Sequence, residues 1–125
     1  MKVALYMRLA RPWYVAFYSR VACADADALF AQESMLINYA ESNGYESGEF
    51  NTHRFYSDNG ESGLTLGRPG MDKLMADARD GRIDVLIVKD LSRVARNFML
   101  IDDWLRFLKK YGVRFISVND EFSIV

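Results

Sequence analysis

The chain of 125 residues carries 16 Lys and Arg against 17 Asp and Glu, a formal net charge of −1, and half of it is hydrophobic. This composition predicts one folded domain, residues 1–125, and excludes DNA binding through bulk positive charge. One cysteine and one histidine exclude a disulfide framework and an ordinary structural zinc site. No apolar run approaches the roughly 18 residues of a membrane span. We therefore expect a cytoplasmic protein without metal or small-molecule cofactor.

Apolar spacing predicts strands that alternate with helices. Glycines at positions 44, 81 and 112 follow the three helical patterns, as expected of residues that end helices. Pro69 suits the first turn of the second helix, where its missing N–H has no partner in any case. In chain order we expect a strand at residues 13–22, a helix at 28–43, a strand at 50–57, a helix at 69–80, a strand at 83–88, a helix at 98–111 and a strand at 113–118.

This alternation indicates the fold class. A helix ends at glycine three times, and a strand begins within a few residues each time. Such a pattern is typical of an α/β three-layer sandwich, in which helices cover both faces of a mostly parallel sheet. We expect a central sheet of four to five strands.

The first twelve residues contain a near-repeat of the first expected strand. Residues 3–10 are identical to residues 15–22 at five of eight positions, and Pro12 separates the two segments. We expect the second copy to be the first strand of the sheet and residues 1–12 to be an N-terminal extension. Three alternative interpretations of the first copy stay open: an added edge strand, a relic of duplication, or a relic of gene-start choice.

Arginine gathers where the expected strands end. Eleven of the sixteen basic residues are arginine, whose planar fork of donors suits phosphate. Arg20 ends the first strand, Ser62 and Arg68 lie in the glycine-rich loop after the second, and Arg93 and Arg96 follow the third. Function in parallel sheets collects at these ends, so the arginines together predict a phosphate site. Arg93 and Arg96 are three residues apart and are expected on one side of a helical turn. For each arginine alone, a solvated or salt-bridged surface position is the alternative.

Four further segments occur in the order of a known family. They are YSDNGESG at residues 56–63, RPGM at 68–71, DVLIVKDLSR at 84–93 and GVRFISVND at 112–120. Together with the first strand, they resemble the catalytic domain of the serine recombinases, the resolvase and invertase enzymes. The likeness is greatest to the large members carried by conjugative transposons and phages, and it covers residues 13–120.

The resemblance implies metal-independent cleavage and exchange of DNA strands at paired sites. In this family a serine attacks the scissile phosphate, forms a covalent phosphoserine link, and the strands rejoin after subunit rotation in a tetramer. The implied partners are DNA, bound through the full-length protein, and a second copy in a homodimer or tetramer, with no membrane. Family members continue with a long helix and a separate DNA-binding region. We expect that C-terminal region to be absent here, and DNA binding by this chain to be weak and non-specific.

The resemblance also assigns residues by position. Tyr18 and Arg20 match the tyrosine and arginine that precede the nucleophile, and Gln32 matches a glutamine beside the active site. The remaining matches are Ser62 and Arg68 to the serine and arginine of the mobile loop, and Arg93 and Arg96 to the arginine pair held over the phosphate.

The nucleophile position holds an alanine. The family pattern Tyr-x-Arg-(Val/Leu)-Ser corresponds to residues 18–22, where Ala22 stands in place of serine. Ala10 ends the other copy of the pattern, but its distance from Gln32 does not fit the family spacing. Loss of a catalytic serine costs on the order of 10⁶ in rate. Cys23 is an alternative nucleophile, although in extended backbone its side chain would point away from that of Ala22.

Three functions therefore stay open. The first is a site-specific DNA recombinase catalytic domain, in which Ala22 is a substitution made for study or a natural loss. The second is a catalytically inactive interaction module with the recombinase fold, which the missing serine and the near-neutral charge favour. The third is an unrelated α/β domain that binds phosphate.

Overall fold

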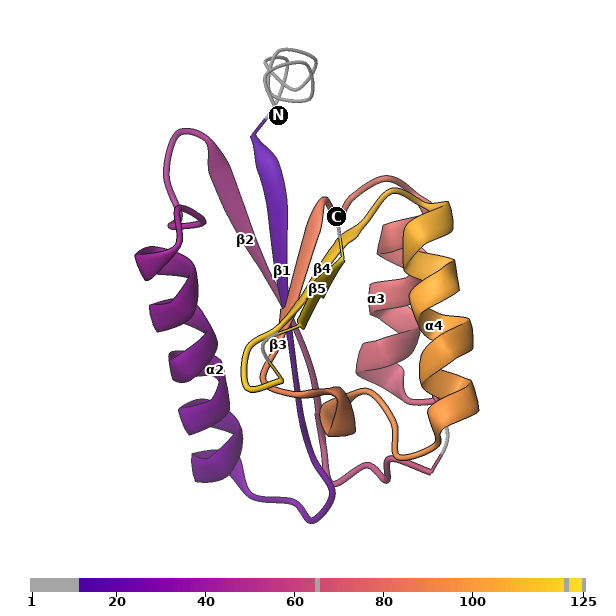
Figure 1. Cartoon of the computed structure of the whole chain (residues 1–125). Coiled ribbons are helices and arrows are strands. Elements are labelled where there is room, and N and C mark those ends of the chain that lie inside the picture. Colours follow the sequence, from indigo (N-terminus) through magenta and orange to yellow (C-terminus); the bar gives the residue numbers. More distant parts are fainter. Residues whose placement is uncertain (1–11, 65, 121, 125) are drawn as a thin grey trace.

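The computed structural model describes residues 12–64, 66–120 and 122–124, and its helices and strands alternate along the chain (Figure 1). No helix within these residues is long and apolar enough to cross a membrane. The elements are β1 (Trp13–Val21), α2 (Ala26–Ser42), β2 (Asn51–Asn59), α3 (Pro69–Arg79), β3 (Val85–Val88), the 3₁₀ helix η1 (Leu91–Arg93), α4 (Phe98–Lys110), β4 (Arg114–Ser117) and β5 (Phe122–Ile124).

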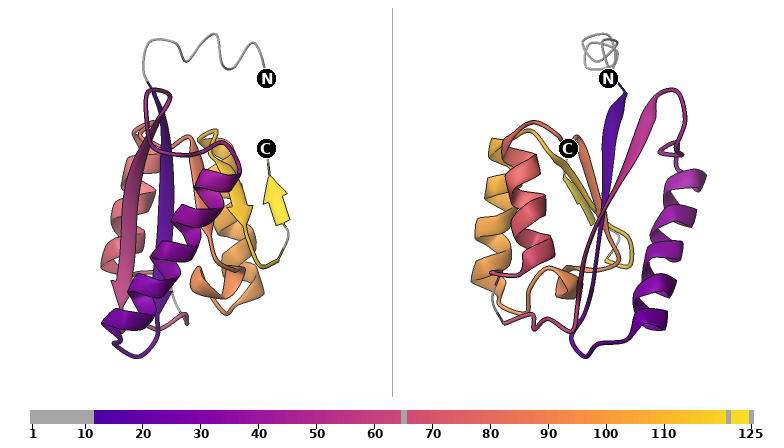
Figure 2. Two further views of the ribbon diagram at one scale, coloured as in Figure 1. Left: turned by 90° about the vertical axis from the view of Figure 1, so that its left-hand side faces the viewer. Right: turned by 180° about the vertical axis from the view of Figure 1, so that it is seen from behind.

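The five strands form one sheet in the order β2-β1-β3-β4-β5. The first four strands pair in parallel, and β5 pairs antiparallel with β4. Helix α2 covers one face of the sheet, and α3 and α4 cover the other (Figures 1 and 2). The predicted three-layer α/β sandwich with a mostly parallel sheet is confirmed.

β1 lies between β2 and β3, and its side chains enter both halves of the core, one on each face of the sheet. Successive side chains of a strand point to opposite faces. Val15 and Phe17 therefore pack with Leu36 of α2, whereas Ala16 and Tyr18 belong to the cluster under α3 and α4. Seven consecutive residues of β1 are buried. This pattern is expected of a strand covered on both faces, where polar residues do not alternate with apolar ones.

Capping residues set where the helices begin and end. The side chain of Asp25 accepts a hydrogen bond from the N–H of Ala28 at 3.0 Å, so α2 begins at Ala26, two residues before the predicted start. Gly44, predicted to end this helix, has a φ of +84°. Helix α3 begins at Pro69, as predicted.

Two strand boundaries differ from the prediction by two residues, and one strand was not predicted. β2 runs to Asn59, because its pairing with β1 continues from Trp13↔Asn51 to Val21↔Asn59. Two polar residues assigned to a loop thus lie in a strand. β3 begins at Val85, two residues after the predicted start. β5 is absent from the predicted elements, because three residues are too short to show a periodicity.

The near-repeat at residues 3–10 lies outside the described residues. Its second copy contains β1, the first strand along the chain, as expected, and this strand lies between β2 and β3. The role of residues 1–12 stays a prediction.

Candidate active site

The predicted site lies at the carboxyl edge of the sheet, where β1 and β3 end. The chain places β2 on one side of β1 and then crosses to place β3 on the other side. The strand order therefore reverses between these two neighbours, and sheets of this kind bind ligands at such a point. Arg20 lies near the end of β1, and η1 follows β3.

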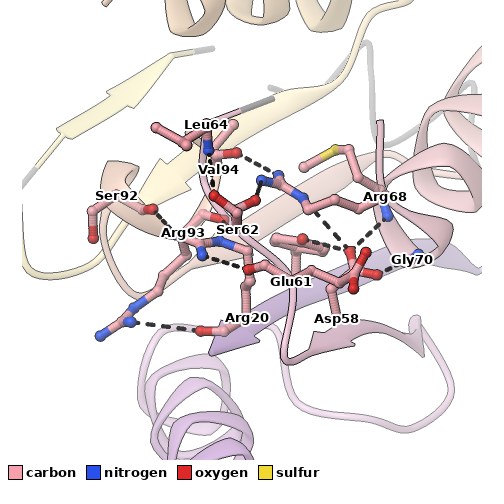
Figure 3. A network of polar contacts seen from close by, with 12 residues as sticks. Arg20, Asp58, Glu61, Ser62, Leu64, Arg68, Gly70, Ser92, Arg93 and Val94 are labelled. Carbon is pink, nitrogen blue, oxygen red and sulfur yellow. Dashed lines mark hydrogen bonds and ion pairs between the residues drawn. The ribbon is translucent and has the colours of Figure 1, made fainter. Parts of the chain in front are cut away.

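Arg20 is buried beneath two loops, with 2% of its surface exposed (Figure 3). Its Nε donates to the carbonyl of Arg93 at 2.8 Å, and its Nη1 donates to the carbonyl of Glu61 at 2.8 Å. Its Nη2 donates to the carbonyl of Ser92. Arg20 thus joins the loop after β2 to η1 through the protein's own backbone.

Arg68 makes a second buried clamp beside the first. It is also 2% exposed, and its Nη1 donates to the carbonyl of Ser62 at 3.1 Å. Its Nη2 donates to the carbonyl of Val94, and its Nε lies 3.8 Å from Oδ2 of Asp58. The two arginines together hold the loop at residues 61–62 against residues 92–94.

Asp58 organises this site, although the sequence assigned it no role. It is 3% exposed. Its Oδ1 accepts from the N–H of Gly70 at 2.7 Å, and its Oδ2 accepts from the N–H of Met71 at 3.1 Å and from the hydroxyl of Tyr18 at 2.6 Å. The free N–H groups at the start of α3 stabilise this carboxylate. The sequence offered only an acidic residue directly after the predicted strand at residues 50–57. Because that strand was predicted to end at residue 57, Asp58 was assigned to a loop.

Arg93 and Arg96 do not share a helical turn, contrary to the prediction. The 3₁₀ helix ends at Arg93, and Arg96 lies in the following loop, where its N–H donates to the carbonyl of Gly63 at 2.9 Å. The side chain of Arg93 is 26% exposed, with Nε 3.7 Å from Asp90 and Nη1 3.5 Å from the carbonyl of Arg20. Arg96 is exposed. These two guanidinium groups are open to solvent, unlike those of the buried clamps.

The structure brings the four predicted arginines together. Burial lowers the pKa of Arg20 from its ordinary value, and the positive charges of Arg68, Arg93 and Arg96 lower it further. The adjacent Tyr18 hydroxyl stays protonated, because burial and its hydrogen bond to Asp58 raise its pKa. Gathered like charges of this kind favour a bound anion.

Gln32 acts on the backbone of Arg20. Its Oε1 accepts from the N–H of Arg20 at 3.0 Å, and its Nε2 donates to the carbonyl of the same residue at 3.2 Å. Gln32 is 5% exposed. The amide thus bonds to the backbone of β1 beyond Tyr18, where the pairing of β1 with β3 ends.

Ala22, Cys23 and Ser62 lie on the exposed rim of the site. β1 ends at Val21 and the next two residues form a bend, so the extended-backbone argument that separates Ala22 from Cys23 does not apply. The Oγ of Ser62 accepts from the N–H of Leu64 at 3.1 Å. Three predicted site residues, Arg20, Arg68 and Gln32, are therefore buried, whereas Ala22, Ser62 and Arg96 are exposed and Arg93 is intermediate.

Fold and site together define a class of protein. It is a doubly wound α/β domain in which four arginines gather at the point where the strand order reverses. Among the described residues, no group of three or more His, Cys, Asp or Glu side chains could hold a metal ion. Residues 15–124 match the family model described as the resolvase N-terminal domain, and the chain belongs to the resolvase family.

Two curated relatives share part of the chain. A putative DNA recombinase of Bacillus subtilis (strain 168) is 39% identical over 71 residues, and the match covers 54% of this chain and 14% of the relative. A probable DNA-invertase y4cG of Sinorhizobium fredii is 40% identical over 68 residues, which are 54% of this chain and 21% of the relative. The matched segments thus span less than a quarter of either relative.

Two solved structures have a similar fold. The N-terminal catalytic domain of TP901-1 integrase matches with a TM-score of 0.78 and 28% identity, over 88% of this chain and 81% of that one. A resolvase family site-specific recombinase from Streptococcus pneumoniae matches with a TM-score of 0.73 and 31% identity, over 89% of this chain and 75% of that one.

Proposed function

We propose that this chain is the catalytic domain of a site-specific DNA recombinase and that its arginines bind a backbone phosphate of DNA. The observation that carries this proposal is the gathering of four guanidinium groups at Arg20, which is two residues before Ala22. Arg93 and Arg96 can offer forked donors to a phosphodiester, and the buried clamps of Arg20 and Arg68 hold the loops that carry them. One such site needs no basic surface, in agreement with the net charge of −1.

The chemistry of the family explains why position 22 decides the activity. A serine there would attack phosphorus, so that an oxygen–phosphorus bond forms and the bond from phosphorus to one sugar oxygen breaks. That sugar oxygen leaves as a hydroxyl and takes the proton, while the arginines stabilise the charge on the phosphate. Alanine has no side-chain oxygen. The chain with Ala22 therefore stops at phosphate binding.

Neutralising the two accessible arginines is expected to weaken DNA binding. The Arg93→Gln/Arg96→Gln variant should bind a labelled duplex roughly tenfold more weakly at low salt, and its affinity should fall less steeply with salt because fewer counterions are released. Fluorescence anisotropy over a range of salt concentrations measures both quantities.

Arg106→Gln is the matched control for charge. Arg106 lies further along α4, its side chain is 77% exposed, and it pairs with Asp102 at 3.0 Å. Its loss should leave the affinity for DNA unchanged. Equal losses in the control and in the double variant would show that DNA senses only overall charge, against the proposed site.

Restoring a serine distinguishes a recombinase from an inactive interaction module with the same fold. The alanine at position 22 favours the inactive module. Ala22→Ser in the full-length protein is expected to form a covalent protein–DNA adduct that survives denaturing electrophoresis, because the substitution supplies the missing oxygen. The unsubstituted protein should form none. A serine variant that still binds DNA and gives no adduct would support the inactive interaction module instead.

A further inference from the structure

A pocket of about 360 Å³ lies beside the arginines, between α2 and the ends of β1 and β3. Its volume is at the lower end of the range of roughly 300–1,000 Å³ that is usual for ligand pockets. The apolar part of its wall comes from β1 and α2, and the polar lining residues are Gln32, Lys89 and Arg93. The apolar residues are Val21, Ala28, Ala31 and Met35.

The side chains of α2 explain why this space is open. In the second half of the helix, Leu36 and Ala40 are buried against the sheet. The amino-terminal end of α2 lies beside the carboxyl edge of the sheet (Figure 1). There Ala28 and Ala31 end at Cβ and remain exposed, so they do not fill the distance to β1. Met35, between the two halves, has a flexible side chain that adapts to a ligand.

The two cations of the pocket have capacity for an anion. Within the described part of the chain, the ammonium group of Lys89 makes no ion pair or hydrogen bond, and Nη2 of Arg93 makes none either. Asp90 is the acidic group that faces Arg93, through Nε at 3.7 Å. Arg20, in contrast, directs its Nε and both terminal nitrogens to backbone carbonyls.

We propose that the pocket binds one nucleotide, with its phosphate on Lys89 and Arg93 and its sugar and base against the apolar wall. This inference rests on the proposed function, because Arg93 serves both, and it adds the nucleoside as a second recognised group. Inorganic phosphate would leave the apolar wall uncovered, whereas a purely apolar ligand would give no acceptor to the Lys89 ammonium group or to Nη2 of Arg93. A nucleotide supplies an anion and a flat apolar face at the same time. It can be a free mononucleotide or an unstacked unit of a DNA strand.

Titrations of ¹⁵N-labelled protein test this assignment. Deoxyadenosine monophosphate is expected to bind about tenfold more tightly than inorganic phosphate, because the base removes apolar surface of the wall from water. It should shift the amide signals of Ala28, Ala31 and Met35. Inorganic phosphate should shift only signals near Lys89 and Arg93.

Filling the pocket provides the matched variant. Ala31→Leu should remove the tenfold difference between the nucleotide and phosphate while leaving phosphate affinity unchanged. Ala76→Leu makes the same exchange at an exposed position of α3 and should change neither affinity. If both leucine variants keep the difference, the base does not enter this pocket and the proposal is wrong.

A single-stranded oligonucleotide distinguishes the two sources of the nucleotide. Shifts in α2 with the oligonucleotide but not with the mononucleotide would assign the pocket to a DNA strand, and shifts with both would show that a free nucleotide suffices. If neither ligand moves the α2 signals while the protein still binds a duplex, the pocket proposal alone is overturned. Failure to bind the duplex at all would instead contradict the proposed function.

Discussion

Replacing Asp58 with alanine is expected to lower the free energy of unfolding by about 3–5 kcal/mol, because it removes the carboxylate that faces the buried guanidinium group of Arg68. The side chains of Asp58 and Arg68 are each 2% exposed, with Oδ2 and Nε 3.8 Å apart. The substitution also removes the acceptor of the Tyr18 hydroxyl and of two backbone N–H groups in the first turn of α3. A buried donor that loses its acceptor is no longer compensated for the free energy of its desolvation.

Urea unfolding followed by tryptophan fluorescence measures this loss. Asp58→Asn should cost less than Asp58→Ala, since it keeps one carbonyl oxygen as an acceptor, and it remains measurable if the alanine variant does not fold. Asp102→Ala is the control, because its pair with Arg106 is exposed and should contribute less than about 1 kcal/mol. Equal losses at positions 58 and 102 would contradict the assigned role of the buried carboxylate.

The role of Asp58 shows that stability and the candidate site depend on the same contacts. Its carboxylate joins the end of β2 to the start of α3, and it also faces the Arg68 guanidinium that holds the loop after β2. Gly63 in that loop has no side chain at the point where one would meet Arg20, since a Cβ there would lie 2.8 Å from Nη2. The arginines are therefore part of the packed structure as well as of the candidate site.

The fold was predictable from the sequence because its signals are local. Helix α4 buries Trp104 and Leu108, which are four residues apart, and this spacing is visible in the sequence. Glycine and proline mark the ends of the helices for stereochemical reasons that need no tertiary information. β5 and the last two residues of β2 were missed because they depend on pairing with distant strands rather than on a pattern of their own.

The site was predictable in position but not in geometry. Arginines that follow parallel strands must meet at one edge of the sheet, so their neighbourhood follows from the order of the elements. The sequence does not show which of them are buried. Arg20 is buried because carbonyls 41 to 73 residues away in the chain accept its hydrogen bonds. The pocket beside the arginines depends in the same way on tertiary packing, because α2, β1 and the segment after β3 line it together.

Replacing Gly70 with alanine is expected to destabilise the fold by about 3 kcal/mol, because it forces an atom into packed backbone. Gly70 lies in the first turn of α3, next to the end of β2. A Cβ at this position would be 2.3 Å from the carbonyl oxygen of Ser57 and 2.9 Å from Oδ2 of Asp58. The nearer atom belongs to the backbone of a strand, so no change of rotamer relieves the contact.

Relief of this contact requires α3 to move away from β2. This movement also affects the candidate site. The N–H of Gly70 donates to Asp58 at 2.7 Å, so the movement weakens the carboxylate that faces Arg68. Gly67→Ala is the matched control three residues earlier, since a Cβ there has no atom within 4 Å. In urea unfolding, the midpoint should fall sharply for Gly70→Ala. The free energy of unfolding of Gly67→Ala should stay within about 0.5 kcal/mol of the original. If both variants are equally stable, α3 does not pack against β2 as closely as described. The ion pair of Asp58 and Arg68 could then separate without unfolding of the domain.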